Sequence, residues 1–259
     1  MSEDNREQLA EDSLISHLVE LRDRLLRALI AVGVIFVPCA LYSNELFTLV
    51  ATPLIEKMPK GTSMIATSLV SPFIAPLKLS LFVALFIAMP YVLFQAWAFV
   101  APGLYRSEKR FAVPLVVSSI VLFYCGVAFA YFVVFPVMFS FFTSTAPAGV
   151  QMMTDMANYL DFVLLLFFAF GIAFEIPVAT VLLAATGMVR VETMTKNRGY
   201  VLLGIFVVAA FLTPPDALSQ TFMAVPMYLL YEIGIIGSKI LLKKRLAEQA
   251  SSEPSSSSG

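Results

Sequence analysis

The sequence predicts an all-α integral membrane protein with six transmembrane helices. Three observations lead to this fold class: 59% of the 259 residues are hydrophobic, only 14% are charged, and the mean hydropathy is +0.86. A typical soluble domain is about half apolar and about one quarter charged. The charges are also confined to short stretches between long charge-free runs, as expected for helices that cross a bilayer.

Composition divides the chain into three parts. Residues 1–13 are polar and acidic, which predicts a flexible cytoplasmic N-terminus without a removable signal peptide. Residues 14–242 contain all the apolar runs and predict the six-helix transmembrane domain. Residues 243–259 are rich in Ser, Ala and Gln, which predicts a disordered cytoplasmic tail.

The stretch before the first apolar run predicts an amphipathic helix. From Leu14, leucines recur at i, i+4, i+7 and i+11, and most charged residues lie opposite them. Glu20 and Arg24 form an i, i+4 pair in the favourable acid-first order. Arg22 lies on the apolar side, where it would either snorkel towards the lipid surface or pair with a neighbouring segment.

Six apolar segments follow, at residues 28–42, 73–99, 111–142, 159–187, 199–212 and 217–242. Pro76 and Pro90 predict kinks in the second segment, Pro136 a bend in the third, and Pro226 an interruption of the sixth. Fourteen residues in the fifth segment give about 21 Å of helix, against a hydrocarbon core of about 30 Å. The fifth segment is therefore either a span in a locally thinned bilayer or a re-entrant segment.

The distribution of Lys and Arg predicts the orientation. Most of the 17 basic residues fall in the N-terminal region, the second and fourth connections, and the tail. Lys57 and Lys60 are the basic residues of the first connection, and the third and fifth connections have none. Both termini are therefore expected in the cytoplasm. We expect short interfacial helices in the first and third connections, on the outer face.

Signatures of catalysis are missing, so we expect no enzymatic activity, no cofactor and no metal site. The one histidine, His17, lies outside the apolar segments. The sequence contains no Walker-type phosphate loop, no G-x-S-x-G and no H-E-x-x-H. Any transport work must then draw on a gradient or a partner protein.

Polar residues within the apolar segments are candidates for function. Glu175 would be costly near mid-span unless it is protonated, paired or facing water. It could be a partnered structural residue, a proton-coupling site or a polar contact for another helix. Glu232 is nearer the cytoplasmic end, where it can snorkel. Asp216 and Gln220, one turn apart, could cap the sixth segment or hold transmembrane helices together.

Two carboxylates are predicted at the same membrane depth, on the otherwise basic cytoplasmic face. Glu20 lies just before the first segment, and Glu108 lies just before the third, in the basic loop of residues 99–110. Such a pair is suited to receive two guanidinium groups, which bind carboxylates in bidentate fashion. Basic neighbours favour the ionised form of both. The alternative for Glu108 is simple charge balance in a solvated loop.

Four motifs occur in order along the chain: H-L-V-E-L-R at 17–22, F-V-A-P-G-L-Y-R-S-E-K-R at 99–110, F-G-I-A-F-E-I-P-V at 170–178 and L-T-P-P-D-A-L-S-Q at 212–220. Together they resemble the TatC family, the polytopic receptor subunit of the twin-arginine protein translocase. The resemblance covers about residues 14–242. It implies a glove-shaped bundle with short fifth and sixth helices, in the bacterial cytoplasmic (inner) membrane.

The resemblance also implies a function. The chain would bind twin-arginine signal peptides of folded proteins at the cytoplasmic face. It would organise TatA-like and TatB-like single-span subunits in an oligomeric complex embedded in membrane lipid. Export would be driven by the proton-motive force, and no nucleic-acid partner is expected.

Site residues follow from the same resemblance. Residues that would form or support the signal-peptide site are Glu20, Glu108, Arg22, Phe99, Pro102, Leu104 and Tyr105. Residues that would serve partner contact and assembly are Pro53, Asp216, Gln220 and Glu232. Glu175 would be the polar residue in the concave face of the bundle.

Two other readings compete with the receptor. The first is a proton- or ion-coupled transporter of small solutes with Glu175 as the coupling site. The absence of inverted repeats and of paired broken helices argues against it. The second is a purely structural scaffold, in which the acidic pair is fortuitous.

Overall fold

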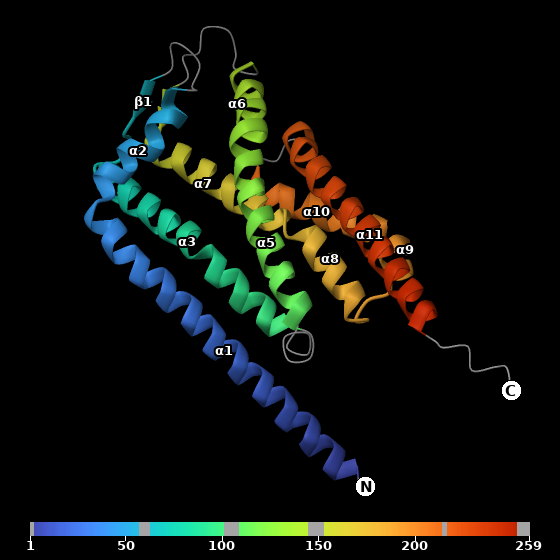
Figure 1. The fold of residues 1–259 in the computed structure, drawn as a ribbon. Coiled ribbons are helices and arrows are strands. Elements are labelled where there is room, and N and C mark those ends of the chain that lie inside the picture. Colours follow the sequence, from blue (N-terminus) through green and yellow to red (C-terminus); the bar gives the residue numbers. More distant parts are fainter. Residues whose placement is uncertain (1–2, 57–62, 101–108, 145–152, 214–216, 253–259) are drawn as a thin grey trace, which may run out of the picture. The chain divides into compact units, whose positions relative to one another are not determined.

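The structure is a computed structural model that describes residues 3–56, 63–100, 109–144, 153–213 and 217–252. Nearly all of these residues are helical, which confirms the all-α class (Figure 1). They belong to two compact units. The first is Met1–Ile120 with Met153–Leu160, and the second is Val121–Met152 with Asp161–Gly259.

The first unit is built around two long helices, α1 (Glu3–Leu41) and α3 (Ser71–Val100). They pack along each other, and α2 (Ser43–Glu56) packs against α3 (Figure 1). The amphipathic stretch and the first apolar segment form one continuous helix, α1. Since α1 begins at Glu3, residues 3–13 are helical and no element boundary lies at residue 13.

A small sheet joins two connections that are far apart in the sequence. Strand β1 (Ser63–Ile65) pairs in parallel with β2 (Met153–Asp155), and Met64 lies opposite Thr154. We expected short helices in both connections. The first connection does contain one, α2, but the third contributes strand β2 among its described residues.

The third apolar segment is interrupted just before Pro136. Helix α5 (Lys109–Phe129) passes into a π-helix, η1 (Ala130–Val134), and then into α6 (Phe135–Ser144). In η1 the backbone N–H of Phe135 donates to the carbonyl of Ala130. Pro136 follows directly and has no N–H to donate, which explains why the regular ladder fails at this point.

The fourth segment breaks at a glutamate. Helix α7 (Met156–Ala173) ends before Phe174, and α8 (Ile176–Ala185) starts after Glu175, with Pro177 in its first turn. Pro177 cannot donate to the carbonyl of Ala173, and a first-turn position is where a helix tolerates proline.

Three further helices complete the second unit: α9 (Val191–Lys196), α10 (Arg198–Leu212) and α11 (Ala217–Ser252). Helix α11 continues past residue 242, where we expected the transmembrane domain to end. It packs against α8, with Gly234 at the contact. A Cβ atom added to Gly234 would overlap Thr180 Oγ1 and lie 2.9 Å from the Cα atom of Pro177.

Five described stretches are helical, long and apolar enough to cross a membrane: Ile15–Leu41, Ser71–Val100, Val113–Phe142, Met156–Ala185 and Ala217–Lys243. Helix α10 is apolar but has only 15 residues. Six spans with both termini in the cytoplasm therefore stay a prediction.

Candidate functional site

The predicted cytoplasmic site begins with a cluster of polar side chains on α1 and α3. Oε1 of Glu20 accepts hydrogen bonds from Nε of Arg24 at 3.0 Å and from Nη2 of Arg24 at 2.6 Å. The remaining nitrogen, Nη1, donates to Oε1 of Gln95 on α3 at 3.3 Å. Gln95 is only 6% exposed, whereas the Glu20 side chain is 34% exposed. Arg24 thus links an accessible carboxylate to a buried amide.

An aromatic contact ties the same two helices together. The ring of His17 on α1 stacks on the ring of Phe99 on α3, with centroids 4.4 Å apart and planes 22° apart. Phe99 is one of the predicted site residues. The sequence alone predicts no specific role for His17, and no local signal indicates its partner.

Arg22 pairs with a residue of its own helix, and its snorkelling towards lipid stays a prediction. Its Nη2 lies 2.8 Å from Oδ1 of Asp23, its neighbour on α1, and its side chain is 66% exposed. It therefore pairs within its own helix and not with a neighbouring segment. A pair this exposed adds little to stability.

Five predicted site residues lie outside the described residues: Pro102, Leu104, Tyr105, Glu108 and Asp216. The expected approach of Glu108 to Glu20 is therefore a prediction. Pro53 lies within α2. Gln220 lies in the first turn of α11 and is half-buried.

Glu175 lies at the break between α7 and α8 and is 8% exposed. Its backbone carbonyl accepts the N–H of Ala179, and its own N–H donates to the carbonyl of Ile172. It therefore occupies the N-terminal cap of α8, although its side chain makes no capping hydrogen bond. The break puts a buried carboxyl where the backbone ladder is already interrupted.

Glu232 forms the most complete polar cluster in the second unit. Nε of Arg198 lies 2.7 Å from Oε1 of Glu232, and Nη2 donates to Oε2 at 2.8 Å. The hydroxyl of Tyr228 also donates to Oε1 at 2.9 Å. Arg198 begins α10, so this bidentate pair ties α10 to α11. The sequence indicated snorkelling for Glu232 but not this partner.

A carboxylate also stabilises the small sheet of the first unit. Asp155 accepts hydrogen bonds from the backbone N–H of Thr67 at 3.1 Å, from the Thr67 hydroxyl at 2.8 Å and from the N–H of Asn158 at 3.1 Å. These donors, the N–H of Thr67 foremost, hold the pKa of Asp155 below its usual value. Asp155 thus links the first connection to the start of α7.

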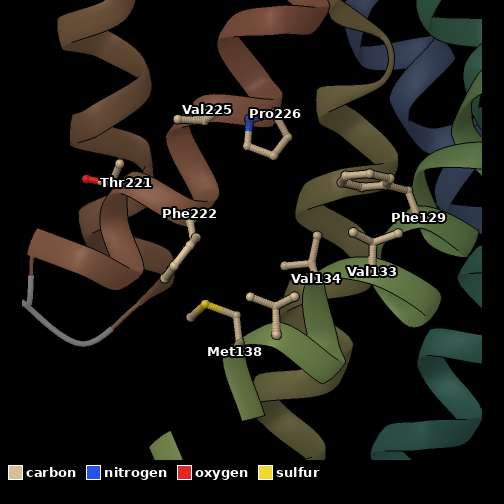
Figure 2. Close-up of a pocket in the computed structure, with 9 residues that line it drawn as sticks. Phe129, Val133, Val134, Met138, Thr221, Phe222, Val225 and Pro226 are labelled. Carbon is tan, nitrogen blue, oxygen red and sulfur yellow. The ribbon is translucent and has the colours of Figure 1, made fainter. Parts of the chain in front are cut away.

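An apolar pocket of about 390 Å³ lies in the second unit. Figure 2 shows one wall formed by Phe129, η1 and Met138, and the opposite wall by residues of α11 around Phe222 and Pro226. The one hydroxyl in the lining, that of Thr221, donates to the carbonyl of Ala217 within α11. None of the predicted site residues that the structure describes lines this pocket. In the described part of the chain, no three His, Cys, Asp or Glu side chains are grouped so that they could hold a metal ion.

Known proteins similar to this chain agree in name. The sequence profile of the family described as Sec-independent protein translocase protein (TatC) matches residues 16–226. The TatC protein of Azotobacter chroococcum is 56% identical over 243 residues, which cover 93% of this chain and 94% of that protein. The Escherichia coli K12 protein of the same name is 54% identical over 231 residues, covering 89% and 90%.

Solved structures agree with the sequence relatives. A crystal structure of the twin-arginine translocase receptor TatC superimposes with a TM-score of 0.77 at 36% identity, over 86% of this chain and 98% of that one. The structure of such a receptor in DDM gives 0.76 at 36% identity. On these matches of sequence and fold, the chain belongs to the TatC family.

Proposed function

We propose that the chain is the signal-peptide receptor of the twin-arginine translocation pathway. It is a multi-pass protein of the bacterial inner membrane, and its family is a protein translocase and not an enzyme. The long apolar helices and the name of the matched structures support this role.

The observation that carries the docking proposal is the contact between Glu20 and Arg24. It is a guanidinium bound to a one-third-exposed carboxylate, near the N-terminal end of the candidate span Ile15–Leu41. Arg24 contacts a single oxygen of Glu20 with two nitrogens. An ionised carboxylate accepts hydrogen bonds from a guanidinium at either oxygen, so a peptide arginine would bind Glu20 by the chemistry that Arg24 shows. The Glu20 side chain is therefore chemically suited to bind an arginine of a signal peptide.

The surrounding residues have supporting roles in this proposal. Phe99, stacked on His17, would hold α1 against α3 and so orient Glu20. Arg22, whose guanidinium pairs with Asp23, would support the site as part of the polar surface of α1 around Glu20. Glu108 would receive the second arginine, with Pro102, Leu104 and Tyr105 shaping its loop.

Site-specific crosslinking tests this assignment directly. A photo-reactive residue at Ser16, one turn from Glu20 on α1, leaves both carboxylates in place and should crosslink to a twin-arginine signal peptide in membranes. The same peptide with two lysines should crosslink much less, because an ammonium cannot form the bidentate contact. A probe at Glu45 on α2 is the matched control. Equal crosslinking of the two peptides would contradict a guanidinium site.

The remaining roles concern partners and energy. We propose that both termini are cytoplasmic, and that single-span TatA-like and TatB-like subunits assemble with the chain in an oligomer driven by the proton-motive force. Pro53, Asp216 and Gln220 would serve this assembly, and Glu232 would support it through its tie to Arg198. Glu175 would offer a polar contact to a helix within the membrane. Crosslinking from Gln220 to a single-span partner tests the assembly face.

A further inference from the structure

A second pocket of about 390 Å³ lies where α9 meets the far end of α11, and its lining is both charged and apolar. Lys239 and Lys243 of α11 line it together with Thr195 and Glu192 of α9. Val191 and Leu242 supply the apolar part. Every lining residue belongs to the second unit.

The two lysines are placed to act together. They are four residues apart on α11, so they lie on one face of the helix, where like charges repel each other. Within the described part of the chain, neither ammonium group forms an ion pair. An anion between them would relieve the repulsion. The hydroxyl proton of Thr195 is shared between the carbonyls of Val191 and Glu192. The two lysines are therefore the groups that would hold the anion.

The position of the pocket along the membrane helix indicates what kind of anion fits. Lys243 is the last residue of the candidate span Ala217–Lys243, so the pocket lies at the end of a membrane helix. Val191 is 5% exposed and packs in a cluster with Met194, Tyr231 and Ile235. Apolar side chains with cationic groups beside them match a ligand that is itself anionic at one end and apolar at the other.

We propose that this pocket binds an anionic phospholipid. Its phosphate lies between Lys239 and Lys243, and its glycerol and first methylene groups lie against Val191 and Leu242. Basic pockets between membrane helices are suited to such headgroups. Glu192 disfavours a doubly charged free anion, because its carboxylate lines the same pocket. This site is separate from peptide docking at Glu20 and does not depend on it.

Lipid retention measured by native mass spectrometry tests the proposal. The purified full-length chain is titrated with phosphatidylglycerol and, separately, with phosphatidylcholine. The double variant K239Q/K243Q should lose about fivefold in phosphatidylglycerol affinity per lysine, and phosphatidylcholine binding should not change. Lys196→Gln removes one positive charge from α9 outside the pocket lining and should have no effect.

Two further variants separate charge from folding. Lys239→Arg keeps the charge and should retain the lipid, whereas Glu192→Gln should strengthen phosphatidylglycerol binding by removing repulsion. Equal phosphatidylglycerol binding by K239Q/K243Q and Lys196→Gln would overturn the proposal. Displacement of the lipid by millimolar inorganic phosphate would also overturn it, because the pocket would then be a site for free phosphate.

Discussion

Two arginine–glutamate pairs in this chain use the same groups in different geometries. Arg24 binds one oxygen of Glu20, four residues away on the same helix. Arg198 binds both oxygens of Glu232 on another helix, and a tyrosine hydroxyl adds a third bond. The first pair leaves its glutamate 34% exposed, and the second leaves its glutamate 24% exposed.

The difference teaches which pair can exchange its partner. An i, i+4 pair within one helix contributes only about 0.3–0.5 kcal/mol, and opening it leaves the bond from Arg24 to Gln95 in place. A bidentate pair between helices holds two elements together, and removing one partner leaves a charge without its counterion. Glu20 is therefore suited to ligand exchange, and Glu232 is suited to structure. Each of the following predictions tests that distinction.

The largest effect is expected from reversing the charge at the exchangeable carboxylate. Glu20→Arg should lower the affinity for a twin-arginine peptide by at least about tenfold, because it removes charge-assisted hydrogen bonds worth about 1.5–3 kcal/mol and adds repulsion. Peptide binding to the protein in nanodiscs measures this. Glu45→Arg, the same reversal on α2, is the control. Unchanged affinity of the Glu20 variant would remove Glu20 from the site.

Breaking the structural pair should have the opposite profile. Glu232→Leu leaves the Arg198 guanidinium, which is 44% exposed, without its carboxylate, and we expect a loss of about 1–1.5 kcal/mol in stability with peptide affinity retained. Thermal unfolding in detergent compares it with Glu20→Leu, which should change stability by no more than about 0.5 kcal/mol. If both variants lost equal stability, the distinction between the two pairs would fail.

The close contact of Gly234 with α8 predicts a loss of stability of similar size. Gly234→Ala places a Cβ atom against Thr180 and Pro177 of α8, so we expect about 1–2 kcal/mol of destabilisation. Gly33→Ala on α1 is the matched control, since a Cβ atom there meets nothing within 4 Å. The control should be neutral or slightly stabilising, because Ala has the higher helix propensity. A tolerated Gly234 variant would show that α8 and α11 can move apart.

The smallest effect concerns a carboxylate that binds neutral donors. Hydrogen bonds lower the pKa of Asp155 in the folded state, so its contribution is present above the unfolded value of about 3.8 and is lost as pH falls through the lower folded value. Amide hydrogen exchange in β1 and β2 should therefore accelerate slightly below about pH 4. Asp155→Asn should abolish this dependence. A pH response that persists in the Asn variant would assign it to another group.

Local patterns in the sequence predict much of this fold, because apolar runs and helical periodicity are local properties. The leucine spacing from Leu14 predicts the amphipathic half of α1, and the pair of Glu20 with Arg24 follows from i, i+4 spacing. Pro136 predicts the disturbance at η1, whereas the break between α7 and α8 was not predicted. Strands β1 and β2 have three residues each and are almost ninety residues apart, so no local pattern reveals them.

The same reasoning explains what was missed at the candidate sites. Gln95 and Phe99 contact α1 only because α3 has a particular rotation about its axis, which a nearly uniform apolar run does not determine. Arg198 and Glu232 are 34 residues apart in the sequence, and their pairing depends on how α10 and α11 meet. The charge pattern supplied the candidate residues, but tertiary packing selects their partners.

Helix α1 runs as one helix from Glu3 to Leu41, so it fixes the distance of the Glu20 carboxylate from the other end of the helix. Glu20 and Leu41 are 21 residues apart, or about 32 Å along the axis, close to the thickness of a hydrocarbon core. Pro38 lies between them, but α1 stays helical from Glu20 to Leu41, so the height and the direction of Glu20 follow from the rest of the helix. One residue inserted at Val34 would raise Glu20 by only about 1.5 Å but turn it by about 100°, away from Gln95. Tolerance of such an insertion would therefore report on orientation far more sensitively than on depth.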